Sequence, residues 1–365
     1  MVNVFIQTYG CQANIADSET MSGILSEEGY NLVNSIKEAD VIVINSCAVK
    51  NATQSKIFHF IEKVPEEKKL VVGGCLTKVV DLKKKFENIK AVFDTNSISK
   101  INSIIESTED YFSDKKEDRI NIPVVRKNNE ISIINIEQGC TNFCTFCATK
   151  LSRGNLKSYR IGDIKRAVGS SIESDCKIIY LTGQDTGAYG LDIKTDLPTL
   201  LNELITIEGN FKIRIGMMNP WHTKRILSEL IEVYKNNKII KFLHIPVQSG
   251  SDNLLMKMRR TRNIEDFRYI VKIFREKISA ITISTDIIVG YPEETEEDFQ
   301  LTIGLIKEIK PEVVNISKFS SRPGTYASKL KQLSSQIIDK RSVELTRIYK
   351  EIRTGNKENK LLVIS

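Results

Sequence analysis

Three cysteines near the middle of the chain are the residues best suited to chemistry. Cys140, Cys144 and Cys147 have the spacing CxxxCxxC. Three thiolates this close together can bind three irons of a [4Fe–4S] cluster and leave one iron open to a small chelating ligand. Gly139, directly before them, allows a sharp turn out of a preceding strand. The alternative is a zinc knuckle, although zinc sites usually show a second, distant Cys-x-x-Cys pair, which this sequence lacks.

A second set of cysteines lies near the start of the chain, one after each of three strand-like runs. These cysteines are Cys11, Cys47 and Cys75, and the runs before them are residues 2–7, 41–44 and 70–72. Because the carboxyl ends of parallel strands share one edge of a sheet, cysteines far apart in the chain can meet there. We therefore predict a three-thiolate site for a second cluster. The spacing leaves one alternative open, which is three separately buried small residues.

The composition favours metal or cluster ligation over disulfide bonds. The chain has 365 residues with seven cysteines, an odd number that fits complete pairing poorly, and only three histidines as other ligands. No apolar run approaches the ~18 residues that would span a membrane. Residues 1–7 lack the basic flank and long apolar core of a signal peptide. We therefore predict a cytoplasmic protein with no membrane partner.

The elements that must position these cysteines fall into two series of alternating strands and helices. In residues 1–110 the strand-like runs alternate with helical patterns at 17–28, 52–63 and 79–86, and Asp17 is the expected N-cap of the first helix. This alternation predicts an N-terminal domain built on a parallel α/β sheet. Residues 111–129 are charged and weakly patterned, which is typical of a linker between domains.

Residues 130–330 contain the second series. The strand candidates are 131–136, 177–182, 212–216, 242–245, 281–289 and 313–317, and the helical patterns are 197–207, 223–234, 264–276 and 296–309. Six such units suit a partial (β/α)6 barrel, in which the carboxyl ends of strands carry the catalytic groups. The CxxxCxxC motif follows the first of these strands. Residues 331–365 are predicted to form a polar helix over 334–358 and then a strand-like run at 361–365.

Positive charge is in modest excess. Lys and Arg number 53 against 46 Asp and Glu, a net charge of +7, which is compatible with a polyanionic partner such as RNA but common in other proteins. Basic residues just after the CxxxCxxC motif, or within the dense basic run at 256–262, are candidates for contacts with RNA phosphates. They are Arg153, Lys157, Arg160, Arg259 and Arg260, and for the first three contact with the carboxylate of a bound cofactor is the other possibility. For such runs a solvated helix end is the default alternative.

The CxxxCxxC motif, with Phe146 before its last cysteine, resembles the signature of radical S-adenosylmethionine enzymes. The resemblance implies that the open iron binds the amino and carboxylate groups of S-adenosylmethionine, whose cleavage yields a 5′-deoxyadenosyl radical. It also implies that Phe146 contacts the adenine, that Gly183 and Gln184 lie against the methionine end, and that Asp286 is among the cofactor-binding groups. The alternatives are an ordinary turn for Gly183 and Gln184 and a structural salt bridge for Asp286. No catalytic residue beyond the cluster ligands is predicted.

The two sets of three cysteines together resemble the methylthiotransferases, and residues 181–190 and 244–249 are most similar to their archaeal and eukaryotic branch. That branch adds a 2-methylthio group to C2 of N6-threonylcarbamoyladenosine at position 37 of tRNA. The resemblance implies two [4Fe–4S] clusters, S-adenosylmethionine, the anticodon loop of tRNA as a partner, and a protein electron donor. The family's small C-terminal RNA-binding β-barrel would begin where the sequence stops at Ser365, so this domain is expected to be missing or truncated.

Two other functions remain open on these residues. The same chemistry serves methylthiotransferases that act on isopentenyladenosine in tRNA or on an aspartate of a ribosomal protein. A non-catalytic iron–sulfur or zinc module that binds RNA would use the same cysteines without cleaving S-adenosylmethionine.

Overall fold

The computed structural model describes residues 1–260 and 263–354. Its N-terminal part is a five-stranded parallel sheet with the order β2-β1-β3-β4-β5. The strands are β1 (Asn3–Thr8), β2 (Asn31–Leu32), β3 (Val41–Ser46), β4 (Lys69–Gly74) and β5 (Ile89–Val92). The central strand, β3, is buried along its whole length because helices cover both faces of the sheet.

Alternation along β3 divides the core of this part into two layers. Ile42 and Ile44 pack in the layer of α2 (Asn51–Glu62), whereas Val41 and Val43 pack in the layer of α1 (Gln12–Glu27) and α4 (Ile101–Ser107). Each fully buried side chain of this kind contributes about 1.5–3 kcal/mol. The strand ends are therefore rigid supports for the loops that follow them. The remaining short elements are α3 (Leu82–Lys85) and the 3-10 turns Cys75–Lys78 and Ile98–Lys100.

The C-terminal part consists of two parallel three-stranded sheets, with the orders β10-β9-β6 and β11-β12-β13. A parallel bridge between Ile213 and Ile239, and a 2.9 Å hydrogen bond from the Met218 N–H to the His244 carbonyl, join the two sheets. The strands are β6 (Ile131–Asn135), β9 (Ile178–Thr182), β10 (Lys212–Ile215), β11 (Phe242–His244), β12 (Thr282–Val289) and β13 (Val313–Lys318). The predicted fold class, an α/β sheet followed by a partial barrel, is confirmed.

The helices of the C-terminal part alternate with its strands or follow the last of them. They are α5 (Ala148–Arg153), α6 (Ile161–Glu173), α7 (Leu197–Ile205), α8 (Pro220–Arg225), α9 (Leu227–Tyr234), α10 (Asp252–Lys257), α11 (Ile264–Lys277), α12 (Glu296–Ile309) and α13 (Ser335–Thr354). The short strands β7 (Glu137–Gln138) and β8 (Lys157–Ser158) form an antiparallel pair on either side of the cysteine motif, and two further 3-10 turns are Thr186–Ala188 and Tyr326–Lys329.

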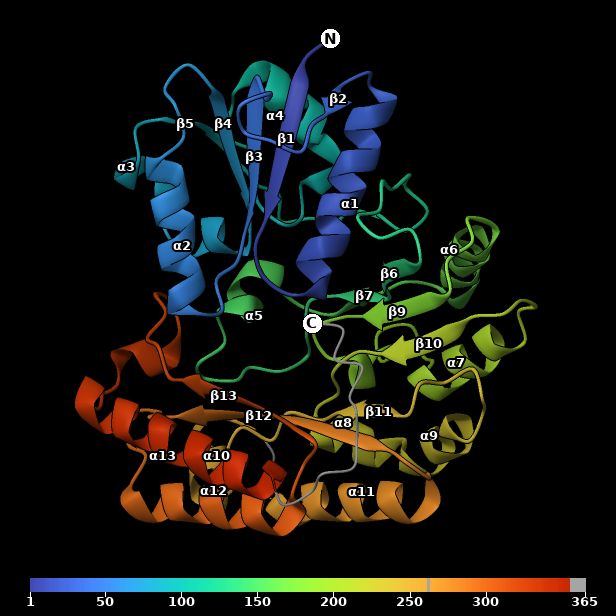
Figure 1. Ribbon diagram of the computed structural model, residues 1–365, viewed down its shortest axis with the longest axis vertical. Helices are drawn as coiled ribbons and strands as arrows, with labels where there is room; N and C mark the ends of the chain where they lie inside the picture. Colours follow the sequence, from blue (N-terminus) through green and yellow to red (C-terminus); the bar gives the residue numbers. More distant parts are fainter. Residues whose placement is uncertain (261–262, 355–365) are drawn as a thin grey trace.

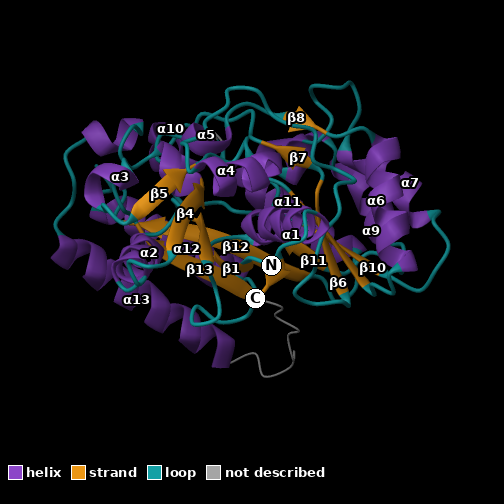
Figure 2. Cartoon of the chain, turned by 90° about the horizontal axis from the view of Figure 1, so that it is seen from above, coloured by secondary structure: helices purple, strands orange, loops and turns teal. Residues whose placement is uncertain are grey.

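The N-terminal sheet lies on one side of the barrel, and α5 lies between them (Figure 1). The strands β1, β3 and β4 run toward the barrel, so their carboxyl ends face α5. Seen from above, the N-terminal sheet lies over β12 and β13 rather than over β10 (Figure 2). The loops that carry cysteines in the two parts of the chain therefore meet at this junction.

The first helix corrects one prediction from the sequence. α1 begins at Gln12, with Cys11 in extended conformation at the N-cap position, so Asp17 lies inside the helix rather than at its start. A carboxylate there is tolerated because it forms ion pairs with Arg119 and Arg153, at 3.1 and 2.6 Å. Two other predicted helices differ from the structure. The helix predicted at 79–86 is only the short α3, and the one predicted at 223–234 is divided into α8 and α9.

The segment predicted as a linker packs closely on α1. The Val125 N–H donates to the Glu19 carbonyl at 3.0 Å, and the Lys127 N–H donates to the Glu19 carboxylate at 3.2 Å. Gly23 allows this approach, because a Cβ there would lie 2.0 Å from the Pro123 carbonyl oxygen. The strand-like run predicted at 361–365 lies outside the described residues. Within the described ranges, no helix is both long and apolar enough to cross a membrane.

Glu19 gives the contact between α1 and the linker a pH dependence. Burial raises the pKa of its carboxyl to about 7, from an ordinary value of 4.5. Folding therefore favours the protonated form, so the stability that Glu19 contributes is complete below pH 4.5 and is lost as the pH rises to about 7. We expect Glu19→Gln to raise the free energy of unfolding by about 1–3 kcal/mol at about pH 8, with little change at about pH 4.

Chemical denaturation at the two pH values measures this difference. Glu27→Gln, at an exposed position of the same helix, is the control and should change little at either pH. An equal effect of Glu19→Gln at both pH values would contradict the prediction.

Candidate functional site

The three N-terminal cysteines, here called the N-terminal triad, lie together where β1, β3 and β4 end. The sulfurs of Cys11 and Cys75 lie 4.0 and 3.8 Å from the same atom, Oδ1 of Asn14. The Cys47 sulfur lies beside Gly10, where an added Cβ would approach it to 3.1 Å. Gly10 has a φ of 118°, a conformation that favours glycine, so the chain can pass this close to Cys47.

Asn14 supports this arrangement through its amide group. Its Nδ2 donates to the carbonyls of Tyr9 and Ser46, at 2.8 and 3.0 Å, and so ties the ends of β1 and β3 to the first turn of α1. Ser46 directly precedes Cys47, so this bond also fixes the backbone beside that thiol. One buried side chain thus contacts the sulfurs of Cys11 and Cys75 and fixes the backbone beside Cys47.

Burial controls the protonation of the N-terminal triad. Cys47 and Cys75 are about 5% and 4% exposed, and burial raises the pKa of Cys47 and raises that of Cys75 to about 12. Both thiols therefore hold their protons at neutral pH, and binding of iron must displace them. Among the described residues, no three His, Cys, Asp or Glu side chains meet closely enough to hold a single metal ion. In a [4Fe–4S] cluster each thiolate binds a different iron, and three soft thiolates around one space fit that group.

The CxxxCxxC cysteines, here called the loop triad, lie between β7 and α5. Cys140 accepts hydrogen bonds from the backbone N–H and the side chain of Asn142, at 3.4 and 3.3 Å, and the Cys147 sulfur caps α5 by accepting from the Lys150 N–H at 3.4 Å. Burial raises the pKa of Cys140 to about 12 and also raises that of Cys147. The turn expected before the motif is present, because Gly139 has a φ of 77°.

A buried carboxylate, Asp185, ties the loop of the loop triad to the barrel. It accepts from Asn142 at 3.0 Å, from the backbone N–H of Asn219 at 2.9 Å and from His222 at 2.7 Å. Burial acts to raise the pKa of Asp185, but the bonds from His222 and Asn219 outweigh it and the pKa lies below its ordinary value. Asp185 is therefore an anion whose bonds fix Asn142 beside Cys140.

The residues predicted to bind the cofactor lie around the loop triad in different ways. Gln184 accepts the Gly139 N–H at 2.6 Å, so it holds the turn before Cys140. Gly183 lies against the buried Glu137, whose carboxylate oxygen would be 2.6 Å from an added Cβ. Phe146 packs edge-on against Tyr291, with ring centroids 6.4 Å apart.

Asp286 lies farther along the barrel wall, on β12. Its carboxylate accepts from His244 on β11 at 3.1 Å and from Asn315 on β13 at 2.7 Å. Burial acts to raise the pKa of Asp286, but His244 and Asn315 outweigh it and the pKa is lowered. The Asp286 carboxylate is half-buried, and His244 is its ion-pair partner when the imidazole is protonated.

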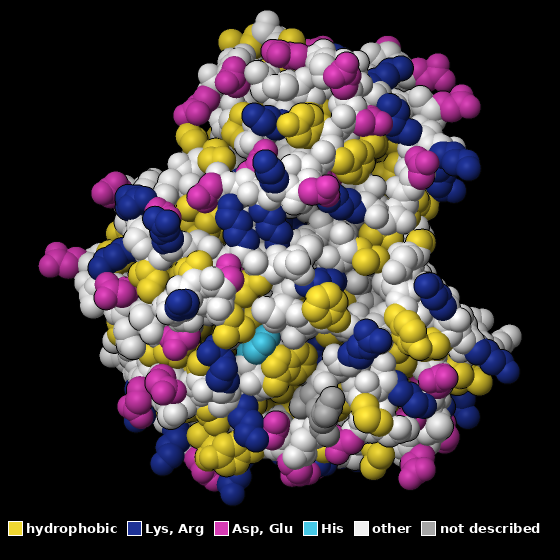
Figure 3. All heavy atoms as spheres, turned by 180° about the vertical axis from the view of Figure 1, so that it is seen from behind, with side chains coloured by type: hydrophobic (Ala, Val, Ile, Leu, Met, Phe, Trp, Pro, Cys, Tyr) yellow, Lys and Arg dark blue, Asp and Glu magenta, His cyan; other side chains and the backbone are white. Residues whose placement is uncertain are grey.

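The basic residues predicted to contact RNA differ in exposure. Arg153 is 3% exposed and paired with Asp17, so the prediction that it meets an RNA phosphate at the surface is wrong for the described conformation. Arg260 is half-buried over the Trp221 ring, and its Nη1 lies 3.6 Å from the Cys144 sulfur. The remaining three reach or approach the surface; they are Lys157, Arg160 and Arg259. Lys and Arg side chains gather near the middle of one face of the molecule (Figure 3).

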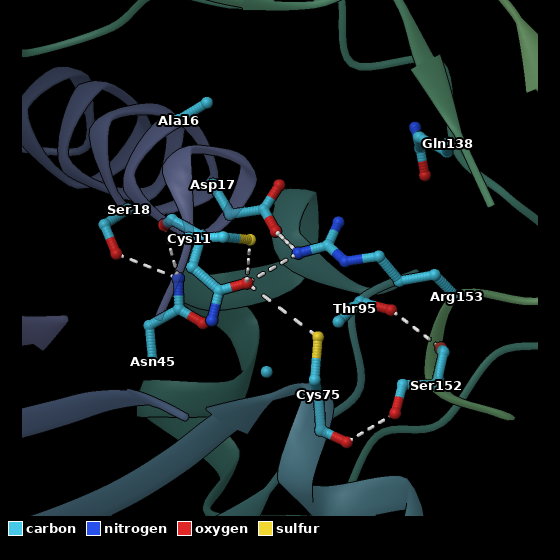
Figure 4. Close-up of polar contacts among 12 residues, drawn as sticks. Cys11, Ala16, Asp17, Ser18, Asn45, Cys75, Thr95, Gln138, Ser152 and Arg153 are labelled. Carbon is cyan, nitrogen blue, oxygen red and sulfur yellow. Dashed lines mark hydrogen bonds and ion pairs between the residues drawn. The ribbon is translucent and has the colours of Figure 1, made fainter. Parts of the chain in front are cut away.

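Helix α5 connects the two triads directly. It starts at the Cys147 cap and ends at Arg153, and its six residues span about 9 Å at a rise of about 1.5 Å per residue. Near its end, Ser152 Oγ donates to the Cys75 carbonyl at 2.6 Å, and Arg153 donates to Asn14 at 2.8 Å. Figure 4 shows Arg153 directed at Asp17 and Ser152 bonded to Cys75. The two triads are therefore held at a fixed, short separation.

Several of these supporting residues were not predicted from the sequence. They are Asn14, Ser152, Asp185 and His222. A signal was present for Asp185, because it follows Gln184 at the carboxyl end of a barrel strand, where functional residues concentrate. No local pattern marks Ser152 and His222, since Cys75 and Asp185 lie 77 and 37 residues away in the chain. The contacts of Asn14 with Ser46 and Cys75 are also distant in sequence.

Asp17 carries the counter-charge of two buried arginines, and this predicts a large loss of stability when its charge is removed. Asp17→Asn leaves Arg119 and Arg153 unbalanced, and we expect the free energy of unfolding to fall by about 3–5 kcal/mol. Asp163→Asn is the control, because it removes the charge from an ion pair with Arg166, which is largely exposed, and should cost less than about 1 kcal/mol. Thermal and denaturant unfolding measure the change in the free energy of unfolding for each variant. Equally small losses in Asp17→Asn and Asp163→Asn would show that the buried ion pairs of Asp17 are not a main contact.

Comparisons with known proteins match two separate segments of the chain, one in the N-terminal sheet and one in the barrel. The uncharacterized protein family UPF0004 matches residues 3–94, and the Radical SAM superfamily matches residues 134–306. Among solved structures, the radical S-adenosylmethionine methyltransferase TsrM from Kitasatospora setae has a TM-score of 0.65 and 13% identity, covering 90% of this chain and 75% of that one. The cobalamin-dependent radical enzyme OxsB has a TM-score of 0.57 and 11% identity, covering 96% and 56%. At these identities the likeness shows a shared fold alone.

Proteins related in sequence share a much higher identity with this chain than these solved structures do. A protein of Pyrococcus horikoshii named "Probable threonylcarbamoyladenosine tRNA methylthiotransferase" is 43% identical over 96% of this chain and 85% of its own length. The Archaeoglobus fulgidus protein of the same name is 42% identical over 99% and 86%. The Homo sapiens threonylcarbamoyladenosine tRNA methylthiotransferase is 39% identical over 95% of this chain and 62% of its own length. The chain therefore belongs to the threonylcarbamoyladenosine tRNA methylthiotransferase family, within the radical S-adenosylmethionine proteins.

Proposed function

We propose that this protein is a tRNA methylthiotransferase that adds a 2-methylthio group to C2 of N6-threonylcarbamoyladenosine at position 37. One observation carries the proposal: two triads of cysteines lie at the two ends of α5 in a chain that is 43% identical to a relative with this name. Transfer of a sulfur group by radical chemistry needs two reactive centres close together, and α5 sets that distance.

S-adenosylmethionine and a [4Fe–4S] cluster belong to the radical superfamily that matches residues 134–306. We assign this cluster to the loop triad, and a second [4Fe–4S] cluster to the N-terminal triad. When bound, S-adenosylmethionine would supply the methyl group and the radical that removes hydrogen from C2, and the second cluster would present the sulfur. The proposed cofactor-binding residues are Phe146, Gly183, Gln184 and Asp286.

The contribution of the chain is to orient these groups and to exclude water. Gln184 and Asp185 fix the loop of the loop triad through the Gly139 N–H and Asn142. The bonds from Ser152 and Arg153 keep the N-terminal triad at the other end of α5. Such preset geometry is what a reaction with a short-lived radical requires, because misplacement lets side reactions compete.

The tRNA is proposed to bind through its anticodon loop, with the target base unstacked into the site. Lys157, Arg160, Arg259 and Arg260 are the candidates for phosphate contacts. A protein electron donor and a location in the cytoplasm complete the proposal. The proposed domains are residues 1–110 for the second cluster, 111–129 as linker and 130–330 as the radical core.

The two triads make a prediction about iron content. After anaerobic reconstitution we expect about eight irons per chain in the wild type and about four when either triad is changed to alanine, because each cluster holds four irons. Reductive cleavage of S-adenosylmethionine should survive loss of the N-terminal triad and disappear with loss of the loop triad. Metal analysis and chromatography of the cleavage products measure the two quantities. Zinc without iron in the wild type would favour the non-catalytic module.

The substrate is tested by mass spectrometry of tRNA nucleosides from cells that lack or express this gene. We expect the 2-methylthio group on N6-threonylcarbamoyladenosine only with the wild-type gene, and its loss with Cys11→Ser or Cys144→Ser, since either change removes a cluster ligand. Cys176→Ser is the matched control, because this cysteine is buried in the barrel core away from both triads and should leave the modification in place. Methylthiolation of isopentenyladenosine or of a ribosomal-protein aspartate instead would overturn the proposed substrate.

A further inference from the structure

Arg322 enters the N-terminal part of the molecule from the barrel. It lies in the loop after β13 and is 3% exposed. Its Nη1 donates to Oε1 of Gln54, on α2, at 2.6 Å, across a sequence separation of 268 residues. A long side chain from the last barrel strand thus ends beside the helix that follows Cys47.

The rest of the Arg322 guanidinium has no partner within the described ranges. Its Nε and Nη2 atoms are buried without a hydrogen bond, and no described carboxylate forms an ion pair with it. An arginine stays protonated in proteins, so a buried guanidinium normally has an anion beside it. Burial acts to lower the pKa of Arg322, and the one charge that acts to raise it is the Cys47 thiolate.

Arg153 and Arg322 therefore differ, although both are buried beside the N-terminal triad. The charge of Arg153 is balanced by Asp17 at 2.6 Å. Arg322 has no such carboxylate beside it among the described residues, and Gln54, which it contacts, lies in the first turn of α2, the helix that begins four residues after Cys47. The unbalanced cation therefore lies beside the segment that connects Cys47 to α2.

A [4Fe–4S] cluster on three thiolates would supply the missing anion. The three thiolates outweigh the positive charge of an oxidised core, and any sulfur anion on the open iron adds to the excess. The reduction potential of such a cluster depends on its net charge, on hydrogen bonds to its sulfurs and on burial. A buried cation whose Nε and Nη2 have no partner among the described residues can act on both the charge balance of the cluster and the hydrogen bonds to its sulfurs.

We propose that Arg322 is the counter-charge and N–H donor of the N-terminal cluster, and that it raises the reduction potential of this cluster. The inference rests on the second cluster proposed above and assigns it a residue from the opposite part of the chain. Arg322 is a positioning and tuning residue, and it makes the cluster sensitive to docking of the barrel against the N-terminal sheet.

The test uses the full chain with C140A, C144A and C147A, so that only the N-terminal cluster is observed. Arg322→Gln and Arg322→Lys are compared with this parent by iron and sulfide analysis and by a redox titration followed by electron paramagnetic resonance. We expect Arg322→Gln to lower the ratio of reduced to oxidised cluster at least tenfold at a fixed potential, which corresponds to about 59 mV for one electron. Arg322→Lys should give a smaller shift. Lys50→Gln, the same change of charge at an exposed position near Cys47, should leave the potential unchanged because solvent screens it.

Each outcome separates this inference from the proposed function. A parent without iron would remove the second cluster itself, and this inference with it. Equal potentials in the parent and Arg322→Gln would overturn the role of Arg322 alone. If Arg322→Gln assembles no cluster, retention in Arg322→Lys supports the role of charge. Loss in both variants, with an unchanged circular dichroism spectrum, would show that shape rather than charge matters and would overturn the inference.

Discussion

The buried ion pair between Asp17 and Arg153 is the contact on which the geometry of the site depends. Asp17 belongs to α1, which begins directly after Cys11, and Arg153 ends α5, which begins directly after Cys147. The same guanidinium donates to Asn14, the residue between the Cys11 and Cys75 sulfurs. Because two buried charges cannot separate without a large cost, this pair keeps both triads in a single arrangement. Small shifts of one triad relative to the other are suppressed in the same way.

Much of the framework follows from the sequence because the signals are local and strong. Continuous apolar runs such as 41–44 mark buried parallel strands, and the barrel strand expected at 177–182 is β9, Ile178–Thr182. Convergence of Cys11, Cys47 and Cys75 could be expected as well, since parallel strands in one sheet place their carboxyl ends at one edge. The prediction needed only the direction of the strands and the position of each cysteine after one of them.

The contacts of charged side chains could not be predicted in this way. Asp17 looks like a helix N-cap, and Arg153 looks like a surface cation after a cluster loop, because in sequence their partners are 136 residues apart. Arg322 and Gln54 are separated by 268 residues. A charged residue is recognised as buried only when the other part of the chain covers it, and that covering is a property of the packed fold rather than of any local pattern.

The distribution of buried charge explains why the two parts of the chain depend on each other. The thiols of the N-terminal triad have raised pKa values, so without cations this pocket would disfavour the thiolates that a cluster needs. The cations beside it, Arg153 and Arg322, both come from the barrel part of the chain. Conversely, Arg153 would lack its counter-charge without Asp17 from the N-terminal sheet. Docking of the two parts therefore creates the electrostatic conditions for the site, and neither part alone contains them.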